Sequence, residues 1–105
     1  MMKLLTKKLK NDLPKLGETE EINNPKALVK IFTPWTSWTW YIIEYDPETE
    51  NCFGIADGFE KELGYFSLNE IKGVTGPGGL KVERDMYYTP KTINEIMDWE
   101  DKKDE

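Results

Sequence analysis

The sequence contains no histidine and only one cysteine, Cys52. Histidine is the commonest general base near neutral pH and the commonest metal ligand, so its absence argues against most acid–base catalysis and many metal sites. A single cysteine forms no internal disulfide, and there is no histidine to activate its thiol as a nucleophile. We therefore expect a protein that is not an enzyme, with no catalytic residue, no metal and no cofactor.

Long apolar runs are also missing. No run approaches the ~20 residues that a helix needs to cross a bilayer, and the first residues show no signal-peptide pattern. With no disulfide framework, these features predict a soluble, cytoplasmic protein without a membrane partner. The 105 residues suit a single domain, 1–105, whose core four Trp, five Tyr and four Phe can fill.

Positive charge is scarce outside the N-terminus. The first 16 residues hold five lysines and one aspartate, a net charge of +4, which leaves −10 on the other 89 residues. An acidic body of this kind repels nucleic acid and favours a protein partner with a basic surface. Nucleic acid is therefore an unfavoured partner, and the oligomeric state stays open.

The order of apolar and turn-forming residues predicts an α+β fold, with an antiparallel sheet of four or five strands and helices mainly on one face. We expect strands over 27–33, 38–45, 52–57 and 62–66. Leucines four residues apart predict a basic N-terminal helix over 3–13, which Pro14 ends. The segment 80–88 could add two short edge strands, 81–83 and 86–88.

Two capping-box patterns predict further helices. Ser67 and Glu70 predict a short inserted helix that Gly73 ends, and Thr92 and Glu95 predict a C-terminal helix beginning at Pro90. Residues 101–105 form a charged tail.

The central feature is a hairpin of the strands 38–45 and 52–57, whose surroundings are strongly acidic. Residues 44–62 contain seven carboxylates against Lys61 alone. Alternate residues of a strand point to one side, about 6.6–7 Å apart, so such a row could imitate the phosphates of a nucleic acid in a basic groove. The alternative is an ordinary solvated turn.

Three tryptophans precede and enter the hairpin. Trp38 and Trp40 share one strand face, and Trp35 lies in the loop before them. They could be core residues, an exposed anchor for a protein partner or a platform for stacked bases. The predicted partner-binding residues are Trp35, Trp38, Glu44, Asp46, Glu48, Glu50, Asp57, Glu60 and Glu62.

Several phrases, taken together and in order, resemble the domain-of-unknown-function family 2958, over about residues 13–97. They are the stretches 13–16, 29–34, 37–41, 62–70 and 82–90. The resemblance implies a small bacterial domain often met on plasmids, phages and other mobile elements. It implies no activity and no site residues, and it leaves the basic N-terminal segment and the charged tail at its margins.

Three functional hypotheses follow. The first is a non-catalytic acidic binding protein of a phage or mobile element. It would be an inhibitor of the anti-CRISPR or antirestriction type that covers the basic surface of a host defence nuclease. The second is a single-stranded nucleic-acid accessory protein of replication or transfer that uses lysines 3–15 and the tryptophans. The third is a small enzyme or ligand-binding domain with a carboxylate site.

Overall fold

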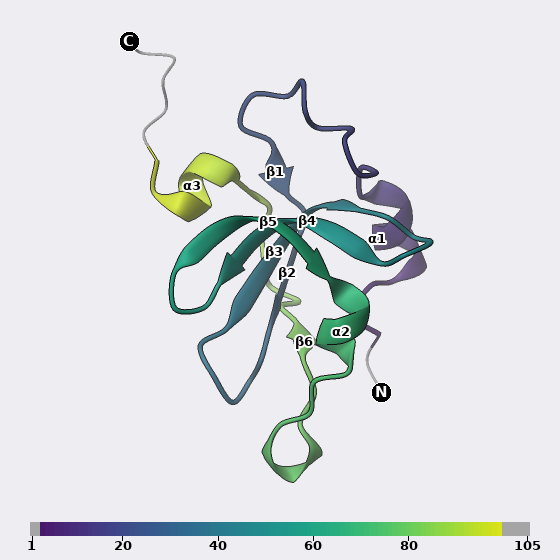
Figure 1. Cartoon of the computed structure of the whole chain (residues 1–105), viewed down its shortest axis with the longest axis vertical. Helices are drawn as coiled ribbons and strands as arrows, with labels where there is room; N and C mark the ends of the chain where they lie inside the picture. The colour runs from purple at the N-terminus through teal and green to yellow at the C-terminus, as the bar shows by residue number, and fades with distance from the viewer. Residues whose placement is uncertain (1–2, 100–105) are drawn as a thin grey trace.

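The computed structural model describes residues 3–99, which form a five-stranded antiparallel sheet, a two-stranded sheet and three short α-helices (Figure 1). The predicted α+β class is confirmed. In the larger sheet the strand order is β5-β4-β3-β2-β6. These strands are β2 (Val29–Phe32), β3 (Thr39–Tyr45), β4 (Asn51–Asp57), β5 (Lys61–Ser67) and β6 (Glu83–Arg84).

The smaller sheet pairs β1 (Lys26–Ala27) with β7 (Lys91–Thr92). It brings residues from the first and last thirds of the chain together. The helices are α1 (Lys7–Asp12), α2 (Leu68–Lys72) and α3 (Ile93–Met97), and a 3-10 turn, η1, covers Pro77–Gly79. Within residues 3–99 no helix has the length and apolarity to cross a membrane.

Side-chain caps set where the helices begin. The hydroxyls of Thr6, Ser67 and Thr92 each accept a hydrogen bond from a backbone N–H three residues on, at 3.1–3.2 Å. At Thr92 the Glu95 carboxylate completes the capping box. The predicted starts at residues 3 and 90 are therefore too early. Residues 91–92 pair as β7 instead of joining the helix.

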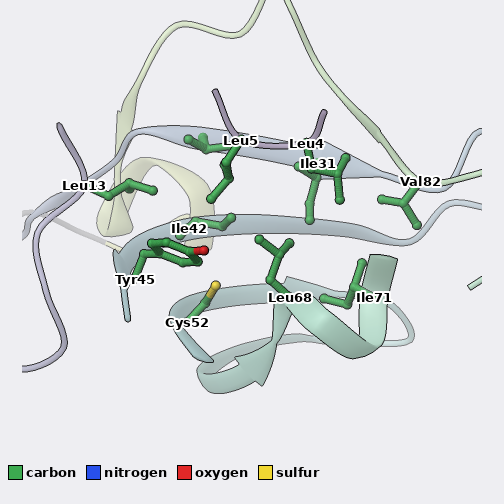
Figure 2. Packing of buried hydrophobic residues seen from close by; sticks show 11 residues of the cluster. Leu4, Leu5, Leu13, Ile31, Ile42, Tyr45, Cys52, Leu68, Ile71 and Val82 are labelled. Atoms are coloured by element: carbon green, nitrogen blue, oxygen red, sulfur yellow. The ribbon is translucent and has the colours of Figure 1, made fainter. Parts of the chain in front are cut away.

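One face of the larger sheet carries the main core (Figure 2). The N-terminal segment and α2 cover this face, where Leu4, Leu5 and Leu68 pack on the strand residues Ile31 and Ile42. All five side chains are buried. The predicted leucine stripe of Leu5, Leu9 and Leu13 thus docks on the sheet, although Leu5 precedes the helix.

The opposite face carries a second core. Ile93 and Ile96 of α3 pack on Ile43 and Ile55. Ile42 and Ile43 are neighbours in β3 and point to opposite faces. The N-terminal segment and α2 thus share the main-core face, as expected, and α3 alone covers the opposite face.

Three predicted strands differ from the structure. The predicted strand 81–83 is β6 at Glu83–Arg84, and Lys81 forms only an isolated bridge with Thr75. The segment 27–33 divides into β1 and β2 at Leu28, whose N–H donates to the Ile42 carbonyl at 3.0 Å. Residues 86–88 are not a strand, and there the Tyr88 hydroxyl donates to the Ala27 carbonyl at 2.8 Å. The predicted tail 101–105 lies outside the described residues.

Candidate functional site

Glu44, predicted to face a partner, is buried with 2% of its surface exposed. The pairing of β3 with β4 shifts between Ile42 and Glu44, so that Ile43 is an extra residue in its strand. Such a β-bulge bends the strand and re-aims the side chains beside it. The prediction for Glu44 is therefore wrong, because simple alternation does not hold at this point.

The Glu44 carboxylate holds the loop before β1 in place. It accepts hydrogen bonds from the Gly17 N–H at 2.8 Å, from the Thr19 N–H at 2.9 Å, and from the Thr19 hydroxyl. Burial acts to raise the pKa of Glu44, but these three hydrogen bonds outweigh it and hold the pKa below its ordinary value. Glu44 is therefore an ionised structural residue.

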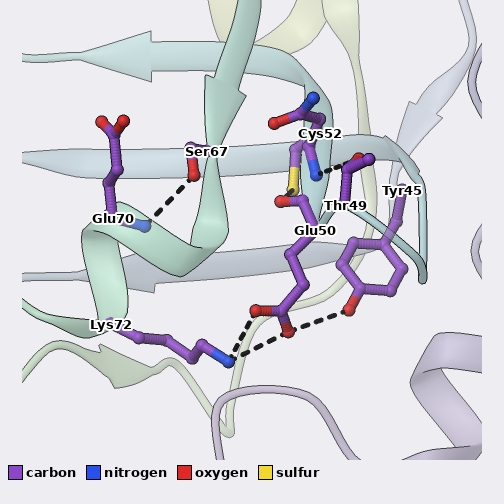
Figure 3. A network of polar contacts seen from close by, with 8 residues as sticks. Tyr45, Thr49, Glu50, Cys52, Ser67, Glu70 and Lys72 are labelled. Atoms are coloured by element: carbon purple, nitrogen blue, oxygen red, sulfur yellow. Dashed lines mark hydrogen bonds and ion pairs between the residues drawn. The ribbon is translucent and has the colours of Figure 1, made fainter.

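Glu50 also has a structural partner (Figure 3). Its carboxylate lies 2.8 Å from the Lys72 ammonium of α2 and accepts a hydrogen bond from the Tyr45 hydroxyl at 3.3 Å. Mainly because of the Lys72 hydrogen bond, the pKa of Glu50 lies below its ordinary value. Glu50 thus joins the hairpin to α2, and its charge is already paired. The prediction that it offers a free carboxylate to a partner is wrong.

Asp46 and Glu48 lie in the turn between β3 and β4. Asp46 accepts hydrogen bonds from the Thr49 hydroxyl at 2.8 Å and from the Glu48 N–H at 3.0 Å. These bonds, the Thr49 one first, hold the pKa of Asp46 below its ordinary value. The Asp46 side chain therefore shapes this turn, while the Glu48 side chain is exposed.

The remaining predicted carboxylates lie at the other end of β4. Asp57 ends β4, Glu60 lies in the following turn and Glu62 is in β5. A seven-residue strand is about 20 Å long, and Figure 1 shows the two turns of the β3–β4–β5 meander at opposite sides of the sheet. The predicted continuous row of carboxylates from Glu44 to Glu62 therefore does not form.

The end that holds Asp57, Glu60 and Glu62 also carries an aromatic cluster. The ring of Trp38 is stacked on Trp40 and meets Phe59 edge to face, with ring centroids 5.8 Å apart in both pairs. Trp38 and Trp40 are half-buried, whereas Phe59 is 95% exposed. We call the six residues Trp38, Trp40, Asp57, Phe59, Glu60 and Glu62 the aromatic end.

A tight turn holds this cluster. The Gly58 N–H donates to the Glu60 carbonyl at 3.2 Å. A β-carbon on Gly58 would lie 2.2 Å from the Trp38 ring, so only glycine lets the turn approach the indole. Lys61 is the one cation of the turn, and its ammonium donates to the Ile96 carbonyl at 2.9 Å. Three carboxylates and one engaged lysine therefore leave the aromatic end negatively charged.

Trp35, also predicted to face a partner, lies elsewhere. Its half-buried ring covers Gly76, where an added β-carbon would come within 2.3 Å of the indole. Trp35 therefore anchors the loop before β3 against the loop after α2. Among residues 3–99 the ring pairs that involve tryptophan join Trp38 to Trp40 and to Phe59, and Trp35 takes no part.

A cavity of about 530 Å³ lies on the main-core side of the sheet. Its apolar lining comes from Leu4, Leu5, Leu68 and Val82, and Figure 2 shows these side chains meeting between the N-terminal segment and α2. Its charged lining consists of Lys3, Lys10, Glu50, Lys72 and Lys81. We call it the lysine-rimmed cavity. Its size falls within the range of small-molecule sites.

The sequence pattern of the family described as protein of unknown function (DUF2958) matches residues 4–104. The chain belongs to the DUF2958 family. The match is wider than the resemblance over 13–97, so the basic N-terminal segment is part of the DUF2958 pattern and not an addition at its margin. Neither the curated proteins nor the solved structures provide a match.

Two features of this DUF2958 protein were not predicted from the sequence. Phe59 follows Gly58 in a turn and has no periodic apolar neighbours, so its contact with Trp38 depends on the β4–β5 pairing. The lysine-rimmed cavity draws its lysines from four separate segments: the N-terminus, α1, α2 and the loop before β6. The uneven charge of the first 16 residues was the one available signal, because it supplies Lys3 and Lys10.

Proposed function

We propose that this DUF2958 protein is a non-catalytic binding protein that docks a partner protein of basic surface through the aromatic end. The observation that carries the proposal is Phe59, which is 95% exposed and yet held against Trp38. An aromatic anchor surrounded by polar groups is the usual anatomy of an interface hot spot. Asp57, Glu60 and Glu62 supply an acidic rim, which suits lysines and arginines on the partner.

The test compares Phe59→Ala with Tyr87→Ala. Tyr87 is a matched control, because it is an aromatic residue that is 97% exposed in a different loop. The two variants and the unchanged chain are immobilised and exposed to an extract of the organism that encodes the protein, and retained proteins are quantified by mass spectrometry. We expect a partner that the unchanged chain and Tyr87→Ala retain, and that Phe59→Ala loses by about tenfold or more. Equal retention by all three would contradict the proposal.

The acidic rim provides a second measurement on the same partner. The double reversal Glu60→Lys with Glu62→Lys is expected to slow association and to weaken its salt dependence. Glu48→Lys, in the opposite turn, is the matched control and leaves both unchanged. Reversal of Glu50 is unsuitable, because it would break the ion pair with Lys72.

The narrower proposal is that the partner is a host defence nuclease. It is supported by the acidic body of the chain, which suits the basic nucleic-acid groove of such an enzyme. Purified chain added to a DNA-cleavage assay with the defence nucleases of the host would then inhibit cleavage, and Phe59→Ala would not. Absence of inhibition removes this narrower proposal and leaves docking at Phe59 to be judged from the retention experiment.

A second candidate function is the binding of a small anion in the lysine-rimmed cavity. Four lysines and one glutamate line this cavity over an aliphatic floor, which suits a carboxylate or phosphate on an aliphatic body. Decanoate, decanol and inorganic phosphate, titrated by NMR, separate the contributions of the charge and of the apolar body. We expect decanoate to bind best.

The double substitution Lys10→Gln with Lys81→Gln tests this second function, with Lys26→Gln and Lys91→Gln as the matched control outside the cavity. We expect the first pair to weaken decanoate binding by about tenfold, and the control to change it little. Equal effects of both pairs, or no decanoate binding, would exclude the cavity as the site.

A further inference from the structure

β5 is an edge strand with an unusually open edge. It pairs with β4 over all seven residues, and within residues 3–99 no strand lies on its other side. Natural edge strands are usually short, or are protected by proline, a bulge or inward-pointing charges. β5 has no proline, its register with β4 shows no bulge, and its charges are confined to Lys61 and Glu62 at its start. Its outer backbone groups are therefore free to pair with another strand.

An apolar surface adjoins this open edge. Leu63 and Tyr65 share one face of β5 and are 38% and 69% exposed. The Tyr65 ring packs on Phe53 of the neighbouring strand, with ring centroids 5.1 Å apart. Ile22, which is also exposed, lines a hollow with Phe53 and Tyr65. A strand added at this edge would cover apolar side chains as well as satisfying backbone groups.

We infer that β5 pairs with β5 of a second copy of the chain, antiparallel and centred on Gly64. In this register Leu63 lies opposite Tyr65 of the other copy, on both sides of the centre. Glu62 then faces Phe66 and Lys61 faces Ser67, so no like charges oppose each other. The sequence of β5 is thus complementary to its own reverse.

The central glycine fits the same register. A β-carbon added at Gly64 would meet no atom within 4 Å, so the sheet face at the centre of the register is open. Centring the pair on Leu63 instead would set Leu63 opposite itself and Tyr65 opposite Lys61, so that the exposed tyrosine ring would lose its apolar partner. The match of Leu63 with Tyr65 therefore selects the register centred on Gly64.

This pairing goes beyond the proposed function, and the two surfaces share only Glu62. β5 begins beside the aromatic end, and antiparallel strands run in opposite directions. The dimer would therefore carry one aromatic end at each end of the new strand pair, with both Phe59 side chains free. Loss of the dimer would leave docking at Phe59 intact, and the Phe59→Ala variant would leave the dimer intact.

Two double variants test the register while removing the same apolar side chains. Leu63→Lys with Tyr65→Lys sets like charges opposite each other at two places, and we expect its dimer dissociation constant to rise by about tenfold or more. Leu63→Lys with Tyr65→Glu sets opposite charges at the same two places, and we expect a dimer that weakens with salt. Sedimentation velocity over a range of concentrations measures both, and circular dichroism checks the fold.

A cross-link provides the second measurement. Gly64→Cys places two thiols opposite each other at the centre of the register, within the Cα separation that a disulfide needs. We expect a covalent dimer on mild oxidation of Gly64→Cys and none for Tyr87→Cys. An unchanged chain that stays monomeric at about 1 mM overturns the inference. So does an equal dissociation constant for the two double variants, or equal cross-linking at positions 64 and 87.

Discussion

The substitution Glu44→Gln tests the claim that a buried, ionised carboxylate holds the N-terminal loop. Two of its three hydrogen bonds come from Thr19 and end on Oε2, and the third comes from the Gly17 N–H and ends on Oε1. A glutamine keeps the shape but offers only one acceptor oxygen. If that oxygen keeps the Thr19 bonds, the amide NH₂ opposes the Gly17 N–H. Loss of one hydrogen bond to a charged group, with an unsatisfied donor left behind, costs about 2–3 kcal/mol.

The expected cost is large for a domain of this size. It lowers the midpoint of thermal unfolding by roughly 8–24 °C, because 1 kcal/mol corresponds to about 4–8 °C in a domain of about 100 residues. Chemical and thermal unfolding at pH 7, followed by circular dichroism, measure the difference between Glu44→Gln and the unchanged chain. Glu48→Gln, at an exposed carboxylate, is the control, and it is expected to change stability by less than about 0.5 kcal/mol.

The pH dependence identifies the cause. The pKa of Glu44 is lowered in the folded state, so its ionised form stabilises the fold above the unfolded-state pKa, and that stabilisation is lost as the pH falls through the folded-state pKa. The difference in the free energy of unfolding between the unchanged chain and Glu44→Gln should therefore be largest at pH 7. It should shrink as the pH falls below 4.5, the ordinary pKa of a glutamate. The other carboxylates titrate in both proteins, so their contributions to the difference in unfolding free energy cancel. A gap under about 0.5 kcal/mol at pH 7, or one that does not change in acid, would refute the reasoning.

Three further predictions concern the core. Gly54→Ala would place a β-carbon 1.9 Å from the Tyr41 carbonyl oxygen, and it should lower the free energy of unfolding by about 3 kcal/mol or more. In Gly64→Ala the added β-carbon meets nothing within 4 Å, and this variant should unfold at the same denaturant concentration as the unchanged chain or at a slightly higher one. Leu68→Ala, at a fully buried site, should lower the free energy of unfolding by about 2–5 kcal/mol, and a smaller loss would contradict the packing of α2. Burial, reinforced by the charge of Glu50, raises the pKa of Cys52 to about 12, so this thiol should react with a disulfide reagent at pH 8 only when the chain unfolds.

Local sequence signals predicted the elements well. Ser67 and Thr92 cap helices as their spacing predicts, because a cap depends only on residues three positions apart. The β-branched and aromatic runs formed β3 and β4, and Gly73 ended α2. These features follow from interactions between residues that are close together in the sequence, so they can be predicted without knowing the tertiary structure.

The candidate site was harder to predict, because long-range pairing decides it. The bulge between Ile42 and Glu44 turns a presumed surface carboxylate into a buried one, and no local signal marks it. The partner of Glu50 is Lys72, which lies 22 residues away. Phe59 is a candidate binding residue only because it contacts Trp38, and the β3–β4–β5 meander brings the two residues together. Of the nine predicted partner-facing residues, the exposed carboxylates Glu60 and Glu62 lie with Trp38 and Asp57 at the aromatic end.

Contacts between the first and last thirds of the chain affect how the protein folds during its synthesis. The Arg84 guanidinium donates to the carbonyls of Lys3 and Leu4, at 3.2 and 2.6 Å and about 80 residues away, and β7 pairs with β1. Contacts of such long sequence separation slow folding towards the millisecond-to-second range. A nascent chain stopped before residue 91 would lack both β7 and α3, and would leave Ile43 and Ile55 uncovered to water. Copies that stop there would therefore be substrates for chaperones and proteases, and a copy must extend through α3 to close both cores.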